Sequence, residues 1–262
     1  MGTPTRSRIQ VSDPLAEVRV SPVRVNGSAV SNRGVELLND AGEWECINIH
    51  SSSYNLIPNT LVEETTRQIL GESALSWEPT GEIWTGRYWA RLYKSDMTVE
   101  APKVGDTLCL GLRVENSYDG SCQFRFVLMA YVLSCENGLL SPKNFTSYKL
   151  RHTNSNQFVT DEAVSVIRSG LDELMEVVPL VERLSDIPLS IELLSQVSRE
   201  TGLPNGMLGL ITKELKEANT AWDLFQAFTH HLTHHGKGKS SLLYQEAVGD
   251  YFLGNLMNRI TV

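Results

Sequence analysis

Residues 77–151 alternate between apolar and polar side chains with a period of two, and β-branched and aromatic residues are dense among them. This periodicity is typical of β strands with one buried face. Asp119-Gly120 lies between two such alternations and predicts a tight hairpin, because a type I′ turn needs positive φ at its central residues. Asn137-Gly138 predicts a second hairpin turn. The segment is therefore expected to fold as an antiparallel meander, with a long strand over residues 123–135.

The residues before the meander predict a hairpin and one helix. Residues 35–57 form two short alternations around the turn sequence 39–42, Asn-Asp-Ala-Gly. Asn59 or Thr60 is a suitable N-cap for the helix that follows, and Gly71 would end it. Residues 1–33 are rich in Pro, Gly and Ser and contain two brief alternations, so they predict a mobile N-terminal arm with one edge strand or a contact with a neighbouring subunit.

The residues after His152 show helical spacing in place of strand signals. Apolar residues recur every three or four positions from Val164 to Val181, which predicts a long amphipathic helix ended or kinked at Pro188. Further helices are expected over 190–202, 205–218, after the N-cap Thr220, and after Ser240 or Ser241. The predicted fold class is α+β, with an arm over 1–33, a β-rich core over 34–158, and a helical region over 159–262 packed on or beside the sheet.

Size and composition narrow the class of protein. A chain of 262 residues with 41% hydrophobic residues can bury a substantial core. No run approaches the roughly 18 apolar residues of a membrane helix, and the first residues lack the apolar core of a signal peptide. We therefore expect a cytoplasmic protein without membrane contact. The four cysteines occur singly within apolar runs, which favours buried thiols over a metal site or disulfides.

Positive charge is concentrated in the predicted sheet. Residues 81–158 have a formal charge of +2, against −4 for residues 1–80 and −6 for residues 159–262. Basic residues that contact phosphates beside rings that stack on bases are what a single-strand binder needs, whereas the plainer interpretation is a solvated sheet face. The candidate nucleic-acid-binding residues are Arg87, Arg91, Arg113, Tyr118, Arg125, Tyr131, Lys143, Lys149 and Arg151. Only alternate residues of a strand share a face, so they cannot all contact one ligand.

Four histidines form a second candidate site. His230 with His234, and His231 with His235, are spaced to share a helix face and could bind zinc. The sequence lacks the Glu that metalloproteases place after the first His and indicates no third ligand. A pH-sensitive patch at a helix C-terminus is the favoured interpretation, and no metal or other cofactor is expected.

The familiar catalytic signatures are missing from the sequence. It contains no nucleophile elbow, no deaminase zinc motif and no glycine-rich dinucleotide fingerprint. A metal-dependent nuclease could still be built from the carboxylates Asp96, Glu100, Asp106, Glu115 and Asp119, although no fixed spacing links them. The sequence therefore favours a protein that is not an enzyme.

Several sequence blocks resemble a family of unknown function found among phages, plasmids and other mobile elements. The matching blocks are Ser53–Pro58, Gly105-Asp106, Asn116–Ser121, Cys135–Leu139, Arg151–Thr153 and Thr220–His235. The resemblance covers most of residues 35–255. A hairpin-rich sheet followed by helices is also similar to the core of the RecT and Redβ annealing recombinases, a likeness at the level of the fold.

These resemblances imply a function that fits the charge distribution. The expected protein binds single-stranded DNA and anneals it without ATP during recombination, as a homo-oligomeric ring or filament. One alternative is a mobile-element protein that binds and blocks a host defence component, since the acidic helical half could mimic DNA. The other alternative is the metal-dependent nuclease.

Overall fold

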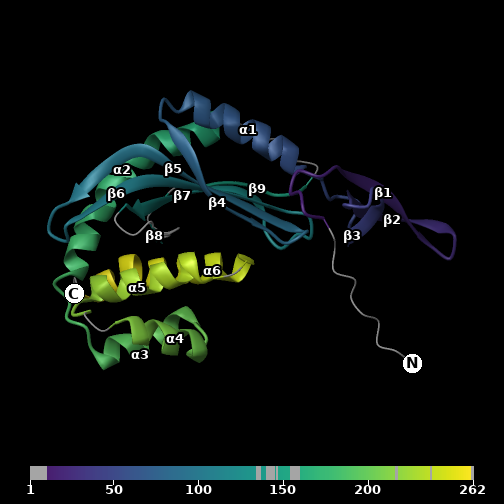
Figure 1. The fold of residues 1–262 in the computed structure, drawn as a ribbon. Coiled ribbons are helices and arrows are strands. Elements are labelled where there is room, and N and C mark those ends of the chain that lie inside the picture. Colours follow the sequence, from purple (N-terminus) through teal and green to yellow (C-terminus); the bar gives the residue numbers. More distant parts are fainter. Residues whose placement is uncertain are drawn as a thin grey trace.

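The computed structural model describes residues 11–133, 137–139, 145, 147–153, 160–215, 218–236 and 238–260. It contains two antiparallel sheets followed by helices, which confirms the α+β class. The first sheet has the order β1-β2-β3, and the second has the order β4-β5-β6-β7-β8 with β9 also paired to β7. Figure 1 shows the first sheet at one end of the molecule, beside the second sheet.

The first sheet corrects the predicted N-terminal arm. Strands β1 (Val18–Val25) and β2 (Ser28–Leu38) form a hairpin, and β3 (Trp44–His50) completes the sheet. Asn26 and Gly27 make the hairpin turn, both with positive φ as a type I′ turn requires. Residues 18–33 are therefore strands of a three-stranded sheet, and the predicted boundary at residue 33 cuts through β2. The predicted turn at 39–42 separates β2 from β3, with Gly42 at φ +78°.

Helix α1 (Asn59–Glu72) begins and ends slightly differently from the prediction. Pro58 is the N-cap residue, and Gly71 lies inside the helix. The Asn59 side chain is used elsewhere: its amide donates to the Pro14 carbonyl at 2.8 Å, and its oxygen accepts from Asn116 at 2.7 Å. This asparagine ties the start of the helix to the sheet and does not cap it.

The second sheet is the predicted meander. Its strands are β4 (Trp77–Trp84), β5 (Tyr88–Ala101), β6 (Asp106–Ser117), β7 (Phe124–Val132), β8 (Asn137–Leu139) and β9 (Ser147–Leu150). Gly120 has φ +72° in the β6–β7 connection, as the Asp119-Gly120 signal predicted. The predicted turn at Asn137-Gly138 is wrong, because both residues lie in β8 opposite Val132 and Tyr131. Strand β7 has 9 residues instead of 13, and β9 and β8 pair with successive parts of its outer edge.

One face of the second sheet is the main apolar core. Alternate residues of β6 (Leu108, Leu110, Leu112 and Val114) are completely buried, and α1 and α2 (Thr160–Leu184) lie over this face. Gly170 lets α2 approach closely, since a Cβ there would lie 2.7 Å from a Leu110 methyl group. Fully burying each leucine contributes about 1.5–3 kcal/mol, so this face supplies much of the stability.

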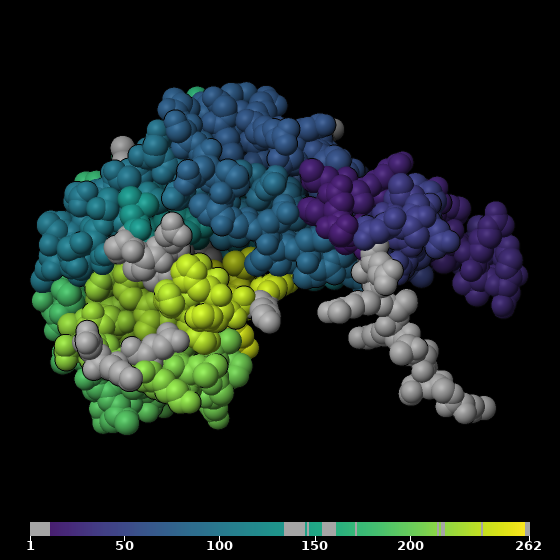
Figure 2. All heavy atoms as spheres, viewed as in Figure 1, coloured from purple at the N-terminus to yellow at the C-terminus, as the bar shows by residue number. Residues whose placement is uncertain are grey.

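The remaining helices follow α2 and reach the opposite face of the sheet. They are α3 (Ile191–Thr201), α4 (Asn205–Glu214), α5 (Ala221–His234), α6 (Gly238–Asp250), the π-helix η1 (Tyr251–Leu256) and α7 (Met257–Ile260). Thr220 caps α5 through a capping box with Asp223, as predicted. The expected cap at Ser240 or Ser241 is wrong, because α6 already begins at Gly238. Figures 1 and 2 show α5 and α6 on the side of the sheet away from α1.

A polar cluster joins the two sheets and contains three of the sequence blocks that carry the family resemblance. The Tyr118 hydroxyl accepts a hydrogen bond from the backbone N–H of Asn59 at 2.8 Å, and the Tyr118 carbonyl lies 2.7 Å from the His50 ring. The rings of His50, Tyr54 and His152 are stacked, with centroid separations of 3.8 and 5.4 Å. Blocks that are far apart in sequence thus meet at this junction.

The buried His152 ring predicts a pH-dependent stability. The ring is only 8% exposed, and neither of its nitrogens has a hydrogen-bond partner within the described residues. Burial is the main cause that holds the pKa of His152 below its ordinary value. The unfolded chain therefore binds this proton more readily, and the free energy of unfolding should fall as the pH drops below about 6.5.

Urea unfolding at pH values from 7.5 to 5 measures this effect. His152→Phe keeps a ring against Tyr54 but cannot bind a proton, so its stability should fall less steeply with acidity. Equal slopes for the wild type and the variant would contradict the assignment.

Candidate functional site

The candidate site lies on the face of the second sheet that points away from α2, here called the second face. Alternate residues of β6 and β7 project from it, including Arg113, Glu115, Arg125 and Tyr131. Lys149 of β9 is directly opposite Arg125 in the strand register and shares this face. Helix α6 packs on it through Leu242, which contacts Tyr88 and Ala90.

Four charged side chains form a buried ion network between this face and α6. Glu246 of α6 pairs with Arg113 and lies 2.9 Å from the Arg125 guanidinium. Glu115 pairs with Arg125 and lies 3.5 Å from Arg113. The Tyr88 hydroxyl donates a further hydrogen bond to Glu115. Two arginines and two glutamates therefore balance, and α6 is fixed to the sheet through charge as well as packing.

The pKa directions show how burial and charge compete in this network. Burial would raise the pKa of Glu115, but Arg113 and Arg125 hold it below its ordinary value. Burial lowers the pKa of Arg113 despite the neighbouring Glu115, since no part of its side chain is exposed. Burial and Glu115 together raise the pKa of Tyr88, so the phenol stays protonated and can donate. The Glu115 carboxylate therefore remains ionised beside its arginine partners.

Several predicted nucleic-acid contacts are unavailable because they are interior or paired. Arg113, Tyr118 and Tyr131 are buried, so their interpretation as surface contacts conflicts with the structure. Arg91 points toward α1 and pairs with Glu63 at 2.8 Å. Arg87 is exposed in the β4–β5 turn, and Lys143 lies outside the described residues. The alternation of the strands predicted which residues share a face, but it did not predict which face a distant helix would cover.

Two other predicted residues are exposed at the edge of the sheet, and a lysine that was not among the candidate binding residues lies against the second face. Lys149 is exposed, and Arg151 is exposed directly after β9. Lys239 of α6 lies 2.5 Å from the Ser121 carbonyl and 5.0 Å from the centre of the Tyr88 ring. We call Arg125, Lys149, Arg151 and Lys239 the basic margin of the second face. In the sequence, Lys239 belongs to the basic run Gly-Lys-Gly-Lys at 236–239. Only the tertiary fold shows that this lysine lies against the sheet.

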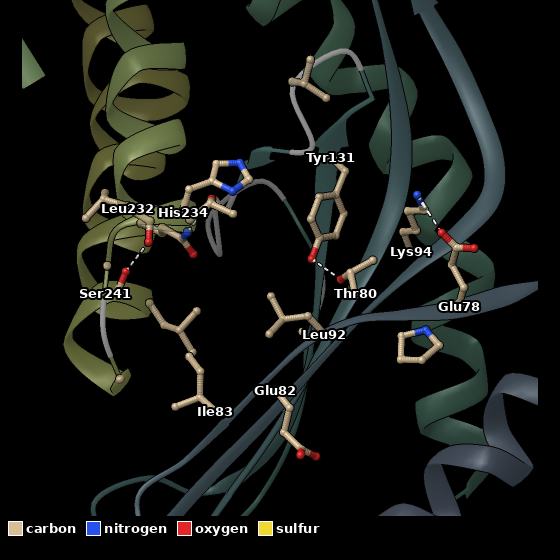
Figure 3. Close-up of a pocket in the computed structure, with 18 of the residues that line it drawn as sticks. Glu78, Thr80, Glu82, Ile83, Leu92, Lys94, Tyr131, Leu232, His234 and Ser241 are labelled. Carbon is tan, nitrogen blue, oxygen red and sulfur yellow. Dashed lines mark hydrogen bonds and ion pairs between the residues drawn. The ribbon is translucent and has the colours of Figure 1, made fainter. Parts of the chain in front are cut away.

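A cavity of about 550 Å³ adjoins the second face, between β4 and the α5–α6 turn. Figure 3 shows the Tyr131 side chain extending along the second face toward Thr80 of β4, and the two hydroxyl groups are 3.1 Å apart. Gly111 of β6 makes room for this ring, since a Cβ there would lie 2.5 Å from it. Burial raises the pKa of Tyr131 to about 12, so its hydroxyl is uncharged at neutral pH.

The close approach at Gly111 predicts a stability effect. Gly111→Val should displace the Tyr131 ring and destabilise the protein by about 1–3 kcal/mol, measured by urea unfolding. Gly81→Val is the matched control, because a Cβ at Gly81 would meet Leu92 at an ordinary 3.6 Å. Equal losses for the two variants would contradict the role assigned to Gly111.

The histidines and carboxylates that the sequence suggested for metal chemistry do not form one site among the described residues. His231 is buried and His230 half-buried, while His234 and His235 are exposed; the His230 and His234 ring centres are 4.6 Å apart. Across the described ranges, no group of three or more His, Cys, Asp or Glu residues could hold a metal ion. The nuclease carboxylates are spread out; for example, Asp106 accepts from the Trp222 indole at 3.1 Å.

The cysteines also differ from one another. Cys109 is buried, Cys122 is half-buried and Cys46 is exposed, so the expectation of buried thiols is wrong for Cys46. Burial raises the pKa of both Cys109 and Cys122 to about 11. Cys135 lies outside the described residues.

Among the helices in the described part of the chain, none is long and apolar enough to cross a membrane.

The fold and site define an α+β protein with a charged sheet face held under a C-terminal helix and a cavity beside it. Residues 47–207 match the family described as Domain of unknown function (DUF932), and the chain belongs to that family. This match confirms the expected resemblance to a family of unknown function. Neither the curated proteins nor the solved structures include a match. The likeness to annealing recombinases stays a prediction.

Proposed function

We propose that this protein binds single-stranded DNA and anneals complementary strands without ATP, as a homo-oligomer. The observation that supports this best is the basic margin. Lys149, Arg151 and Lys239 add positive charge beside Arg125 at the edge of the sheet, in a chain of net charge −8. Such a margin favours an anionic backbone over neutral partners.

The geometry suggests how binding would serve annealing. The predicted stacking rings Tyr118 and Tyr131 are buried, so the margin offers cations to phosphates and no stacking platform from these two residues. A strand held mainly by its phosphates leaves most of its bases free to pair with a complementary strand. No bond is made or broken, and neither a nucleotide cofactor nor a metal enters this scheme.

Salt dependence of DNA binding tests the proposal. We expect Lys149→Gln, Arg151→Gln and Lys239→Gln each to weaken binding of a labelled 50-nucleotide strand and to reduce the slope of log affinity against log salt by about one at most. Arg168→Gln, on the exposed side of α2, is a matched control that should leave the slope unchanged.

Light scattering and an annealing assay complete this test. The proposal predicts oligomers and ATP-independent acceleration of annealing, with the acceleration reduced in the three margin variants. Absence of strand binding at every salt concentration would overturn it, as would a slope that none of the three variants changes.

A further inference from the structure

The cavity beside the second face is lined by both polar and apolar side chains and has an open rim. Its apolar lining residues include Leu92 and Ile83 of the sheet and Leu242 of α6, and the exposed strand β4 forms the rim. A volume of about 550 Å³ is in the range of cavities that hold small organic ligands. A mixed lining of this kind suits a flat body with apolar faces and a polar edge.

One buried polar group in the lining lacks a partner. Gln245 of α6 is 3% exposed, and its amide nitrogen donates to the Thr233 hydroxyl at 2.9 Å. Its side-chain oxygen has no hydrogen-bond partner within the described residues. A buried acceptor without a donor is unfavourable by about 1–3 kcal/mol, so a ligand N–H group that reached this oxygen would relieve the cost.

The charges around the cavity are already compensated. Lys94 pairs with Glu78 at 2.7 Å, and Glu82 lies 3.4 Å from the Arg91 guanidinium. Thr80 and Tyr131 add hydroxyl groups that can donate or accept. The lining therefore favours an uncharged ligand with donors and acceptors along one edge.

We propose that this cavity binds a nucleobase. A base is planar and uncharged, and its pairing edge carries both hydrogen-bond donors and acceptors. This chemistry matches a mixed lining in which Leu92 and Leu242 lie near the Gln245 oxygen and the hydroxyls of Thr80 and Tyr131. The inference rests on the proposed function, in which the base belongs to the bound strand; a free nucleoside presents the same chemistry. One base held by each subunit would set the spacing of the strand along the oligomer.

Strands with and without bases test this inference on the full-length protein. We expect the wild type to bind a 30-nucleotide thymidine strand about ten-fold more tightly than an abasic strand with the same backbone. Gln245→Leu, and Thr80→Trp, which fills the cavity from the exposed strand, should reduce that ratio to about two-fold or less. Gln68→Leu, on the exposed side of α1, should keep the wild-type ratio.

The outcomes separate this inference from the proposed function. Equal, salt-dependent binding of both strands would overturn the base site and leave single-strand binding in place. Binding of free deoxynucleosides, lost in both cavity variants, without binding of either strand would support the base site and overturn the annealing function. Absence of all three kinds of binding would overturn both.

Discussion

Glu115→Gln is expected to destabilise the protein by about 3–5 kcal/mol, because it leaves the buried Arg113 and the half-buried Arg125 with one carboxylate. Glu115 is completely buried and faces both Arg113 and Arg125. Removing one partner of a buried ion pair is far more damaging than removing both, since the remaining charge has no solvent to stabilise it. Arg113 is fully buried, so its charge would lose the most stabilisation.

A compensating variant separates lost charge balance from lost packing. Arg113→Met/Glu115→Gln leaves Arg125 paired with Glu246 and still gives the Tyr88 hydroxyl an acceptor. This double variant should recover most of the stability, to within about 1–2 kcal/mol of the wild type.

Urea unfolding measures both variants against an exposed ion pair. Glu78→Gln breaks the Lys94–Glu78 pair, in which the Glu78 side chain is 62% exposed, and should change stability by less than about 1 kcal/mol. If Glu115→Gln were no more damaging than Glu78→Gln, or if the double variant were worse than Glu115→Gln, the assigned network would be wrong.

Asn116→Ala should lower stability by about 3 kcal/mol. The buried Asn116 amide donates to the Ile57 carbonyl at 2.8 Å and to the Asn59 side chain at 2.7 Å. Alanine would leave both acceptors without this donor, at about 1–3 kcal/mol each. Part of the loss is offset, because the Asn116 oxygen itself has no partner among the described residues.

An exposed asparagine provides the comparison for this junction. Asn32→Ala, on the exposed part of β2, should change the midpoint of thermal unfolding by a degree or two at most. A similarly small change for Asn116→Ala would show that the junction between the sheets does not depend on this side chain.

The regular parts of the fold could be predicted because their signals are local. Alternation along the meander, the positive-φ turn at Asp119-Gly120 and the Thr220 cap all depend on neighbouring residues. The signal at Asn137-Gly138 failed because the same dipeptide fits a short strand that pairs with the end of β7. The first half of strand β2 was missed because it is polar and exposed, so no buried face marks it in the sequence, whereas the half from Val35 onward was predicted.

The candidate site was harder to predict because its partners are far apart in the chain. Arg113 and Arg125 face Glu246, more than 100 residues later, and no local pattern indicates that pairing. A basic residue on a strand gives the same signal whether water or a helix covers it. Lys149 and Arg151 stay exposed because β9 lies at the margin of the face, beyond the part that α6 covers.

The position of Glu246 also determines where the chain can be shortened. The match to the family ends at Met207, inside α4, so a fragment cut there would keep both sheets and α2 but lose α5 and α6. Arg113 and Arg125 would then lose Glu246, and the cavity would lose the wall that carries Gln245. We expect such a fragment to be insoluble or unfolded when expressed, so the unit of folding extends at least through α6.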